Sequence, residues 1–453
     1  MIILNDNAMS IEKNVGGLAK LLSLLRSSDE YLKLKEVYRR AARKIPGGMR
    51  FYAFTSRVKN RIKRLVLPST LFENMGLTYL GPVDGHNLPD LIALLRSARD
   101  LRAPVLVHVL TKKGHGYAPA ESQPAKFHGV GKFDPQTGET LGKKERSFSG
   151  SFGETLTTLA KEDSRICAIT AAMPGGTGLL GFKENFPERL FDVGIAEEHA
   201  VSMAGGLAKQ GMIPVVAIYS TFLQRSYDQI MQDAAMLGLH VVFAVDRAGL
   251  VGEDGETHHG VYDVGYLRHA PGMTVLCPAN TAELKAMMRW AVEDCAGPVA
   301  VRYPRGGDGK YIASGWNGET DVVSLRQGND FAVVTYGTLV NQALDAADIL
   351  EQEGIHVSVI RLTKILPLPT DALVQALNGH KRILLAEEAA AAAGIHESIS
   401  MELYKRIPDA DIYLANLGER YVTHGSISEL YCIHGLDAAS IAAKIREVLK
   451  VEN

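Results

Sequence analysis

The chain has 453 residues, more than a single hydrophobic core needs, and at roughly 100 to 200 residues per domain this length predicts about three domains. Its 49 basic and 51 acidic residues give a formal net charge of -2, which excludes the global positive field that gathers nucleic acid or an anionic membrane. Neither a signal-peptide pattern nor an apolar run long enough to span a bilayer is present. The cysteines are scattered without a C-x-x-C pair, so we expect a cytoplasmic protein with neither a disulfide framework nor a zinc site.

The first residues read as a short strand, Ile2 to Leu4, that runs directly into the polar turn Asn5-Asp6-Asn7. A short apolar strand of a parallel sheet is buried on both faces and lies between neighbouring strands. We therefore expect the strands that precede it in this domain to belong to sequence upstream of residue 1.

Residues 31–64 carry twelve Lys or Arg residues against one acid, Glu36. Interleaved aromatic residues make a nucleic-acid surface one interpretation. The basic residues fall between apolar positions at helical spacing, however, which favours a solvated helical lid.

Residues 77–146 contain one α/β unit and a long connection. An amphipathic helix is predicted at Leu88–Arg99 and an apolar strand at Pro104–Leu110. Residues Thr111–Arg146 are rich in glycine, proline and lysine and lack periodicity, which indicates a surface connection that binds a ligand or links domains.

Two further blocks of alternating strands and helices follow, and this alternation implies mostly parallel sheets. The strands expected in the second block are Ile166–Thr170, Ile213–Tyr219, Val241–Val245 and Val299–Arg302. In the third block we expect strands at Phe331–Tyr336, Val357–Ile360 and Ile383–Ala386, a helix at Val340–Gly354 and a final helix ending at Leu449. The polar, glycine-rich segment Gly306–Gln327 is typical of a linker, and Ala389–Ala393 reads as a helix entry or a packed loop.

The strongest local signal is FDVGIAEEHA at residues 191–200, where a strand end is followed by a carboxylate that opens an apolar helix of small residues. Taken alone, Glu197 is equally well explained as an acid that complements the helix dipole. The flanking alanines, Val201 and Met203 would desolvate this carboxylate and strengthen any hydrogen bond that it makes to a ligand.

Residues 219–229, YSTFLQRSYDQ, come directly after a strand and enter a helix. This places them at the carboxyl edge of a sheet, which is where ligands bind in open α/β folds. The alternative is an ordinary capped helix with Phe222 in the core.

A glycine-framed loop at residues 246–260, DRAGLVGEDGETHHG, carries acids and two adjacent histidines. A metal site would need a third ligand, and neighbouring residues of one loop rarely point at a common ion. A glycine-framed loop that carries Asp and His residues is better suited to proton transfer near neutral pH. Downstream, the run VRYPRG at residues 301–306 supplies a guanidinium just after a strand. Planar guanidinium groups fit a phosphate well, but arginines are common on protein surfaces, so the spacing alone indicates little.

Together, these runs resemble the 1-deoxy-D-xylulose-5-phosphate synthase family of transketolase-like thiamin diphosphate enzymes. Residues 191–200 resemble the pyrimidine-domain motif that transketolases share, while the D-R-A-G…D-G-x-T-H-x-G loop and the K-F-H…K-F-D run at residues 126–134 are typical of the synthases. The runs LGPVDGH and TKKGHGY, at residues 80–86 and 111–117, are also family-like. The chain departs from the family at Glu387–Gly394, where alanines replace a glycine-rich E-E-N…G-G pattern.

The resemblance implies a three-domain, transketolase-like thiamin diphosphate-binding α/β fold with mostly parallel sheets, whose first domain is incomplete. The implied partition is residues 1–112 for the C-terminal part of the diphosphate-binding domain, 113–146 for the interdomain connection, 147–306 for the pyrimidine-binding domain, 307–327 for a linker and 328–453 for the transketolase C-terminal domain. In the family, the first two domains of one subunit enclose the cofactor, and the subunits form homodimers.

The same resemblance assigns roles to matching residues. Glu197 bonds the aminopyrimidine ring and favours the imino tautomer that removes the thiazolium proton, whereas an amide there would hold the ring without exchanging the proton. Phe222 stacks on the pyrimidine, Tyr117 packs against the cofactor, and His258 and Asp254 protonate and position the substrate. The implied substrate-binding residues are Tyr219, Arg225, Arg247 and Arg305, of which the last two grip the phosphate. His128 is either a surface histidine or faces the active site.

ILNDNAMSI, at residues 3–11, resembles the second half of the thiamin diphosphate motif, in which a Gly-Asp-Gly turn comes first and an Asn follows. Both halves hold one Mg2+ ion, which prefers oxygen ligands. Asn7 matches the metal-binding Asn, with the Met9 carbonyl as a candidate further ligand. The matching Gly-Asp-Gly would lie before residue 1, because Gly307-Asp308-Gly309 falls in the expected linker and Asp254-Gly255 in the wrong domain.

The implied reaction condenses pyruvate with D-glyceraldehyde 3-phosphate to 1-deoxy-D-xylulose 5-phosphate with loss of CO2, and the product feeds isoprenoid, thiamin and pyridoxal synthesis. Because half of the diphosphate site would be missing, two other roles stay open. The chain is then one subunit of a split enzyme that needs a separate N-terminal chain, or an inactive remnant that binds subunits.

Overall fold

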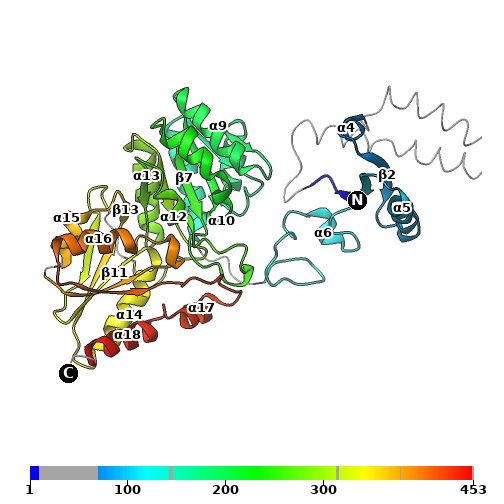
Figure 1. Cartoon of the computed structure of the whole chain (residues 1–453). Coiled ribbons are helices and arrows are strands. Elements are labelled where there is room, and N and C mark those ends of the chain that lie inside the picture. The colour runs from blue at the N-terminus through cyan, green and yellow to red at the C-terminus, as the bar shows by residue number, and fades with distance from the viewer. Residues whose placement is uncertain (10–69, 142–145, 313–315, 378, 451–453) are drawn as a thin grey trace, which may run out of the picture. The chain divides into compact units, whose positions relative to one another are not determined.

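The computed structural model describes residues 1–9, 70–141, 146–312, 316–377 and 379–450. The chain divides into two compact units, Met1–Lys143 and Lys144–Asn453 (Figure 1). The basic segment 31–64, expected to be a helical lid, lies outside the described residues. None of the helices in the described ranges is long and apolar enough to cross a membrane.

The first unit contains a three-stranded parallel sheet with the order β1-β3-β2. Its elements are β1 (Ile2–Asp6), α4 (Thr70–Asn74), β2 (Thr78–Asp84), α5 (Leu88–Asp100), β3 (Val105–Leu110) and α6 (Ala118–Ser122). Leucines of α5 pack against the alternate valines of β3. Asn87 caps α5, because its side chain accepts a hydrogen bond from the backbone N–H of Asp90. The α/β unit predicted here is confirmed, and β1 forms one edge of the sheet within the described residues.

The second unit begins with a seven-stranded sheet in the order β13-β8-β9-β7-β6-β4-β5, parallel throughout except between β13 and β8. Its strands are β4 (Ile166–Thr170), β5 (Leu190–Asp192), β6 (Ile213–Tyr219), β7 (Val242–Asp246), β8 (Thr274–Leu276), β9 (Val299–Arg302) and β13 (Lys364–Leu366). The helices around it are α7 (Phe148–Glu162), α8 (Leu180–Asn185), α9 (Glu197–Lys209), α10 (Ser220–Leu223), α11 (Tyr227–Gln229), α12 (Asp263–Leu267) and α13 (Thr281–Glu293). The predicted strands β4, β6 and β9 keep their predicted bounds, and β7 is shifted by one residue.

Both faces of this sheet are covered, because successive side chains of a strand point to opposite sides. Val216 and Ile218 of β6 face a core shared with α9 and α12. Val215 and Ala217 face a second core, which α7 and α13 build. Strands buried on both faces read as continuous apolar runs, which explains why their bounds could be predicted.

A five-stranded sheet follows in the order β10-β12-β11-β14-β15, in which only β10 runs antiparallel to its neighbour. Its strands are β10 (Val322–Arg326), β11 (Phe331–Tyr336), β12 (Val357–Leu362), β14 (Arg382–Ala386) and β15 (Asp411–Ala415). Its helices are α14 (Val340–Glu351), α15 (Thr370–Leu377), α16 (His396–Arg406), α17 (Ile427–His434) and α18 (Ala438–Lys450). Figure 1 shows α14 and α18 on the lower face in this view and α15 and α16 on the upper face. The segment expected to be a linker therefore contains an edge strand, β10, and the alanine run is a packed loop with a short helical turn at Ala391–Ala393.

The two sheets of the second unit are tied together by a strand and by a buried ion pair. β13 follows β12 in the chain but pairs with β8 at the edge of the seven-stranded sheet. Nη1 and Nη2 of Arg361, on β12, donate to the two carboxylate oxygens of Glu283, on α13, at 2.5 and 2.8 Å. Both side chains are almost fully buried, so this bidentate pair fixes the two sheets against each other.

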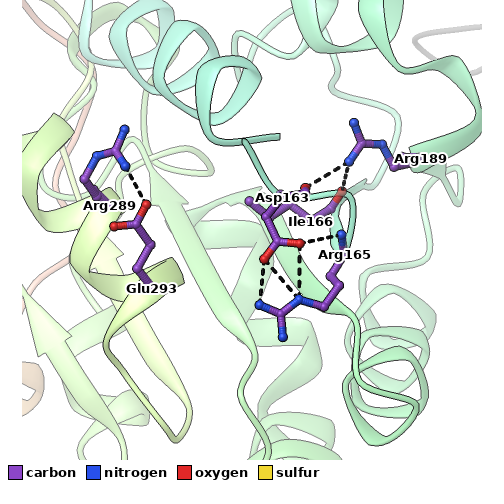
Figure 2. A network of polar contacts seen from close by, with 6 residues as sticks. All are labelled: Asp163, Arg165, Ile166, Arg189, Arg289 and Glu293. Carbon is purple, nitrogen blue, oxygen red and sulfur yellow. Dashed lines mark hydrogen bonds and ion pairs between the residues drawn. The ribbon is translucent and has the colours of Figure 1, made fainter. Parts of the chain in front are cut away.

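The edge of the seven-stranded sheet where the strands begin carries its own polar contacts (Figure 2). Nη1 of Arg189 donates to the backbone carbonyls of Asp163 and Ile166 at 3.2 Å each. The Asp163 carboxylate pairs with Arg165. These contacts stabilise the chain where it enters β4. They lie at the opposite edge of the sheet from the carboxyl ends of the strands.

Candidate active site

Four parallel strands deliver polar side chains to the carboxyl edge of the seven-stranded sheet. β5 ends at Asp192, β6 at Tyr219, β7 at Asp246 and β9 at Arg302. Ligands of open α/β sheets bind at this edge. The sequence motifs of the second unit follow these four strand ends, as predicted.

Glu197 is the first residue of α9, and its side chain is only 3% exposed. The preceding turn is set by Asp192, whose Oδ1 accepts hydrogen bonds from the N–H groups of Ala172 and Gly194 at 2.8 and 3.0 Å. Oε2 of Glu197 has no hydrogen-bond partner among the described residues. Burial raises the pKa of Glu197, while a backbone N–H and Arg225 oppose this shift. The predicted placement of this acid at a strand-to-helix junction is confirmed.

Arg225 lies against both acids at the start of α9, from a short helical turn at Gln224–Ser226. Its Nη1 is 2.9 Å from Oε2 of Glu197, without the alignment of a hydrogen bond, and its Nη2 is 3.6 Å from Oε1 of Glu198. The arginine side chain is 46% exposed. Its positive charge therefore favours the ionised form of Glu197 while one face of the guanidinium stays accessible.

Three aromatic rings from the motifs after β6 and β7 contact one another in a row. The Tyr219 and Phe222 rings are stacked with centroids 5.8 Å apart, and the His258 ring meets Phe222 edge-on at 5.3 Å. The guanidinium of Arg247 lies 3.7 Å from the centre of the Tyr219 ring. Burial raises the pKa of Tyr219 to about 12, so its hydroxyl keeps its proton at neutral pH.

Arg247 is held in a strained but well-supported position. Its φ of 57° lies in the left-handed region, and its Nη1 donates to the carbonyl of Gly176 at 3.1 Å and to Oδ1 of Asp246 at 3.2 Å. A Cβ atom at Gly176 would lie 1.8 Å from the Tyr219 hydroxyl oxygen, so a glycine is required where this ring ends. Burial raises the pKa of Asp246 to about 6, and Arg247 opposes the shift.

The loop between β7 and α12 is closed at its base by two backbone hydrogen bonds between Gly249 and Gly260, at 2.7 and 2.8 Å. Asp254 ends the short helical turn Gly252–Asp254 and accepts a hydrogen bond from Nη1 of Arg305 at 2.8 Å. The same Nη1 donates to the Val251 carbonyl at 2.9 Å. The structure thus brings together Asp254 and Arg305, which lie 51 residues apart in the sequence.

The two adjacent histidines point to different surroundings. His258 is half-buried, and its Nδ1 lies 2.9 Å from the Thr257 hydroxyl. His259 is buried, with Nδ1 3.2 Å from the Val251 nitrogen and Nε2 3.0 Å from the Thr423 carbonyl. In the described part of the chain, no cluster of three or more His, Cys, Asp or Glu residues could hold a metal ion.

A cavity of about 580 Å3 opens beside this loop. It is lined by Thr221, Phe222, Gln224, Arg225, Glu256, Thr257, His259, Tyr262 and Tyr421. Of the residues predicted for the site, Phe222 and Arg225 line it. Its size is that of a small-molecule site.

The remaining predicted residues belong to the first unit. Oδ1 of Asn7 accepts a hydrogen bond from the Met9 N–H at 3.0 Å, in a tight turn that follows β1. The Tyr117 hydroxyl donates to the Pro135 carbonyl at 2.9 Å, and His128 Nδ1 lies 3.2 Å from Nζ of Lys113. These residues lie in the first unit, whereas Glu197 lies in the second.

Within the second unit, Glu197 fits the aminopyrimidine ring of thiamin diphosphate. The buried Oε2 of Glu197 lies near Nη1 of Arg225 but makes no aligned hydrogen bond, so it can accept one from a protonated or N–H-bearing ring nitrogen. For Mg2+, Asn7 Oδ1 and the Met9 carbonyl are oxygen ligands of the right kind. The neighbouring Asp6 carboxylate is buried against His108, 3.1 Å away, and is thereby committed to another contact.

Sequence reasoning missed two groups that touch the loop from the C-terminal part of the chain. Glu388 accepts a hydrogen bond from the Leu250 N–H at 2.8 Å, and Thr423 contacts His259. A hint existed in the acidic pair Glu387-Glu388, which we noted only as the start of an unusual alanine run.

Known synthases and transketolases are similar to this chain in all three of its domains. Residues 1–111 match the family described as 1-deoxy-D-xylulose-5-phosphate synthase, residues 144–307 match the transketolase pyrimidine-binding domain, and residues 320–441 match the transketolase C-terminal domain. The 1-deoxy-D-xylulose-5-phosphate synthase of Clostridium kluyveri is 44% identical over 456 residues, which cover 100% of this chain and 72% of that protein. The synthase of Desulforudis audaxviator is 45% identical, over 96% of this chain and 69% of that protein.

Two solved structures are also similar. A chain described as a split gene transketolase, in an inactive β4 tetramer, has 26% identity and a TM-score of 0.61, with 68% of this chain and 100% of that chain covered. The transketolase of Campylobacter jejuni, at 17% identity and a TM-score of 0.57, shares the fold and covers 83% of this chain and 68% of that one.

The paired α/β sheets, with an acid at the start of α9, define a transketolase-like enzyme of the thiamin diphosphate-dependent class. Within that class, the chain belongs to the 1-deoxy-D-xylulose-5-phosphate synthase family, which are transferases.

Proposed function

We propose that this protein condenses pyruvate with D-glyceraldehyde 3-phosphate to form 1-deoxy-D-xylulose 5-phosphate and CO2, the first step of non-mevalonate isoprenoid synthesis. The observation that carries this proposal is the buried Glu197 carboxylate at the carboxyl edge of the sheet. Its Oε2 lies 2.9 Å from Nη1 of Arg225 but makes no hydrogen bond among the described residues. Membership of the synthase family supports the choice of substrates.

Thiamin diphosphate, when bound, supplies the carbon nucleophile and accepts the electrons released by decarboxylation. Glu197 would hold a proton between Oε2 and the ring nitrogen of the aminopyrimidine. Its raised pKa suits this role, because a carboxyl that keeps its proton more readily exchanges it more evenly with a weak ring base. Phe222 would face the pyrimidine, and Tyr117 of the first unit would pack against the cofactor.

The substrate would lie along the row of rings and the loop. Arg247 and Arg305 would bind the phosphate, since guanidinium groups match phosphate oxygens in a planar, two-point geometry. Arg225 and the Tyr219 hydroxyl would face the reacting end, where Arg225 already borders the cavity. His258 would exchange a proton with the aldehyde oxygen through Nε2, because its Nδ1 contacts Thr257, and Asp254 would orient Arg305 and the substrate.

Mg2+ would be bound by Asn7 Oδ1 and the Met9 carbonyl, together with oxygens of the diphosphate. We also propose that two copies of the chain form a homodimer, as the family resemblance implies.

The direct test is product formation by the purified chain from pyruvate and D-glyceraldehyde 3-phosphate, with thiamin diphosphate and Mg2+ supplied. Mass spectrometry should detect 1-deoxy-D-xylulose 5-phosphate and an equal amount of CO2. Consumption of pyruvate without that product would contradict the proposed substrates.

A second candidate is a subunit that acts with a separate chain carrying the Gly-Asp-Gly half of the cofactor motif. What favours it is the similarity to the split gene transketolase chain, all of which is covered and which is described as an inactive β4 tetramer. Calorimetric titration with thiamin diphosphate and Mg2+ separates the two candidates. Tight binding by this chain alone would contradict the split enzyme, whereas binding that appears only with an added upstream polypeptide would support it. Absence of binding in both cases would support an inactive, subunit-binding role.

A further inference from the structure

We propose that Glu388 and His259 are positioning residues, through which the segments Glu387–Ala391 and Tyr421–Ile427 hold the loop that carries Asp254 and His258. The expected kinetic effect rests on the proposed function, whereas the expected hydrogen-exchange effect rests on the geometry of the loop alone. Nothing in the sequence motifs of the loop requires these distant segments.

Glu388 reaches the loop from the end of β14. It is 8% exposed, and its Oε1 accepts a hydrogen bond from the Leu250 N–H at 2.8 Å. The Tyr431 hydroxyl, on α17, also hydrogen-bonds this carboxyl group. A Cβ atom at Gly249 would lie 2.6 Å from the Glu388 carboxyl carbon, so the carboxyl group fits directly against the loop backbone.

His259 forms the second attachment. The Val251 N–H can only donate, so Nδ1 of His259 must accept, and the Thr423 carbonyl can only accept, so Nε2 must carry the proton. This arrangement requires the neutral ring with its proton on Nε2. Burial lowers the pKa of His259, which stabilises that form. The ring therefore connects both sides of the loop to Thr423.

Between the two attachments, the loop lies close to the segment after Thr423. A Cβ atom at Gly252 would be 3.2 Å from the Gly425 carbonyl oxygen, and one at Gly255 would be 3.3 Å from Cβ of His424. The stretch from Gly249 to Gly255 thus follows the surface of the C-terminal part closely. Asp254 lies within this stretch.

His258 directly precedes the His259 anchor, and Asp254 follows the anchored Val251 by three residues. Arg305 adds a third restraint, because it holds the Val251 carbonyl as well as Asp254. Catalytic geometry is sensitive to small displacements, so loss of an anchor should reduce the rate without removing any group that touches substrate.

Glu388 gives the sharper experiment, because the chain offers a matched control next to it. Glu387 is also buried, with 2% of its surface exposed. It accepts a hydrogen bond from the Ile395 N–H at 3.0 Å and pairs with His396 at 3.1 Å, and neither partner belongs to the loop. Replacement of either carboxylate by alanine leaves one buried backbone N–H without its partner. Only Glu388→Ala should do so within the loop.

The measurement is residue-level hydrogen exchange of the full chain. Glu388→Ala should speed exchange at Leu250 and Val251 at least tenfold, whereas Glu387→Ala should speed exchange at Ile395 and leave the loop at the parental rate. Glu388→Gln should restore the loop, because its amide oxygen can still accept from the Leu250 N–H. Equal effects of Glu387→Ala and Glu388→Ala on the loop, or no effect of Glu388→Ala, would overturn the proposal. Should Glu388→Ala fail to fold, Glu388→Asp, which withdraws the carboxylate by one methylene, decides in the same way.

The kinetic readout is kcat/KM for D-glyceraldehyde 3-phosphate. It should fall about tenfold in Glu388→Ala, with KM for pyruvate close to the parental value, and recover in Glu388→Gln. A parental chain without synthase activity but with the predicted exchange pattern would contradict the proposed function and leave the positioning intact. If Glu388→Ala shows the parental kcat/KM, the positioning role of Glu388 is contradicted, but the proposed function is not.

Discussion

The Tyr219 hydroxyl occupies the space that a side chain at Gly176 would need, since a Cβ atom there would lie 1.8 Å from the hydroxyl oxygen. The Gly176 carbonyl also accepts a hydrogen bond from Arg247, which covers the Tyr219 ring. One glycine thus places both a proposed substrate-facing hydroxyl and a proposed phosphate-binding guanidinium.

Gly176→Ala should therefore raise the KM for D-glyceraldehyde 3-phosphate about tenfold, because Tyr219 and Arg247 must both move. Gly175→Ala is the control, since a Cβ atom there meets its nearest neighbour at 3.9 Å. Steady-state kinetics of the two variants provide the measurement. Similar KM values in both would show that this ring and guanidinium do not form the substrate site.

Arg225→Gln should shift the acid limb of the pH–activity profile to higher pH. The positive charge of Arg225 favours ionised Glu197, so its loss raises the pKa of a carboxyl that burial has already raised. Arg165→Gln, which removes an exposed arginine near β4, is the control. An acid limb that stays at the parental pH would mean that Arg225 does not act on Glu197 electrostatically.

The free energy of unfolding of the parent protein should fall with rising pH more steeply than that of the Glu388→Gln variant. Burial raises the pKa of Glu388 from 4.5 to about 7. The folded protein then holds this proton more tightly than the unfolded chain, so its stabilising contribution is present below pH 4.5 and is lost as the pH rises toward 7. The pKa difference corresponds to about 3 kcal/mol. Urea unfolding of parent and variant at pH 5 and pH 8 measures the change, and parallel pH dependences would contradict it.

Arg361→Met should destabilise the second unit by about 3 to 5 kcal/mol, because it leaves the buried Glu283 carboxylate without its partner. The double variant Arg361→Met, Glu283→Leu should recover much of this loss, since no buried charge remains. Arg289→Met removes exposed pairs with Glu293, one helical turn away (Figure 2), and with Glu162 of α7, and it should barely change the unfolding midpoint. A full loss in the double variant would show that packing, rather than charge, explains the effect.

The sequence predicted those elements whose burial is complete. β6 reads as an unbroken apolar run because both of its faces are covered, and the start of α9 at Glu197 follows from an acid placed just after a strand. The sequence predicts a linker where β10 lies, because β10 is a half-buried edge strand whose polar and glycine-rich surroundings resemble a loop. Local patterns do not distinguish these two cases.

Contacts between segments that are distant in the sequence could not be predicted either. Glu388 and Leu250 are 138 residues apart, and no local motif pairs a carboxylate with one particular backbone N–H. The divergence of His258 and His259 likewise depends on Thr423, which only the folded chain brings near. Resemblance to a family implies roles for residues within the motifs. The contacts of Glu388 and Thr423 with the loop are seen only in the folded structure.

The central claim, that Glu197 exchanges a proton with the aminopyrimidine ring, is tested most directly by Glu197→Gln beside Glu198→Gln. Both variants lose one carboxylate at the start of α9, but Glu197 is buried and Glu198 is 43% exposed. Measured with saturating thiamin diphosphate and whatever upstream polypeptide the binding experiment requires, Glu197→Gln should lower kcat at least about 100-fold while it still binds the cofactor. Glu198→Gln should keep close to the parental kcat. Product formed by Glu197→Gln at the parental rate would contradict the account.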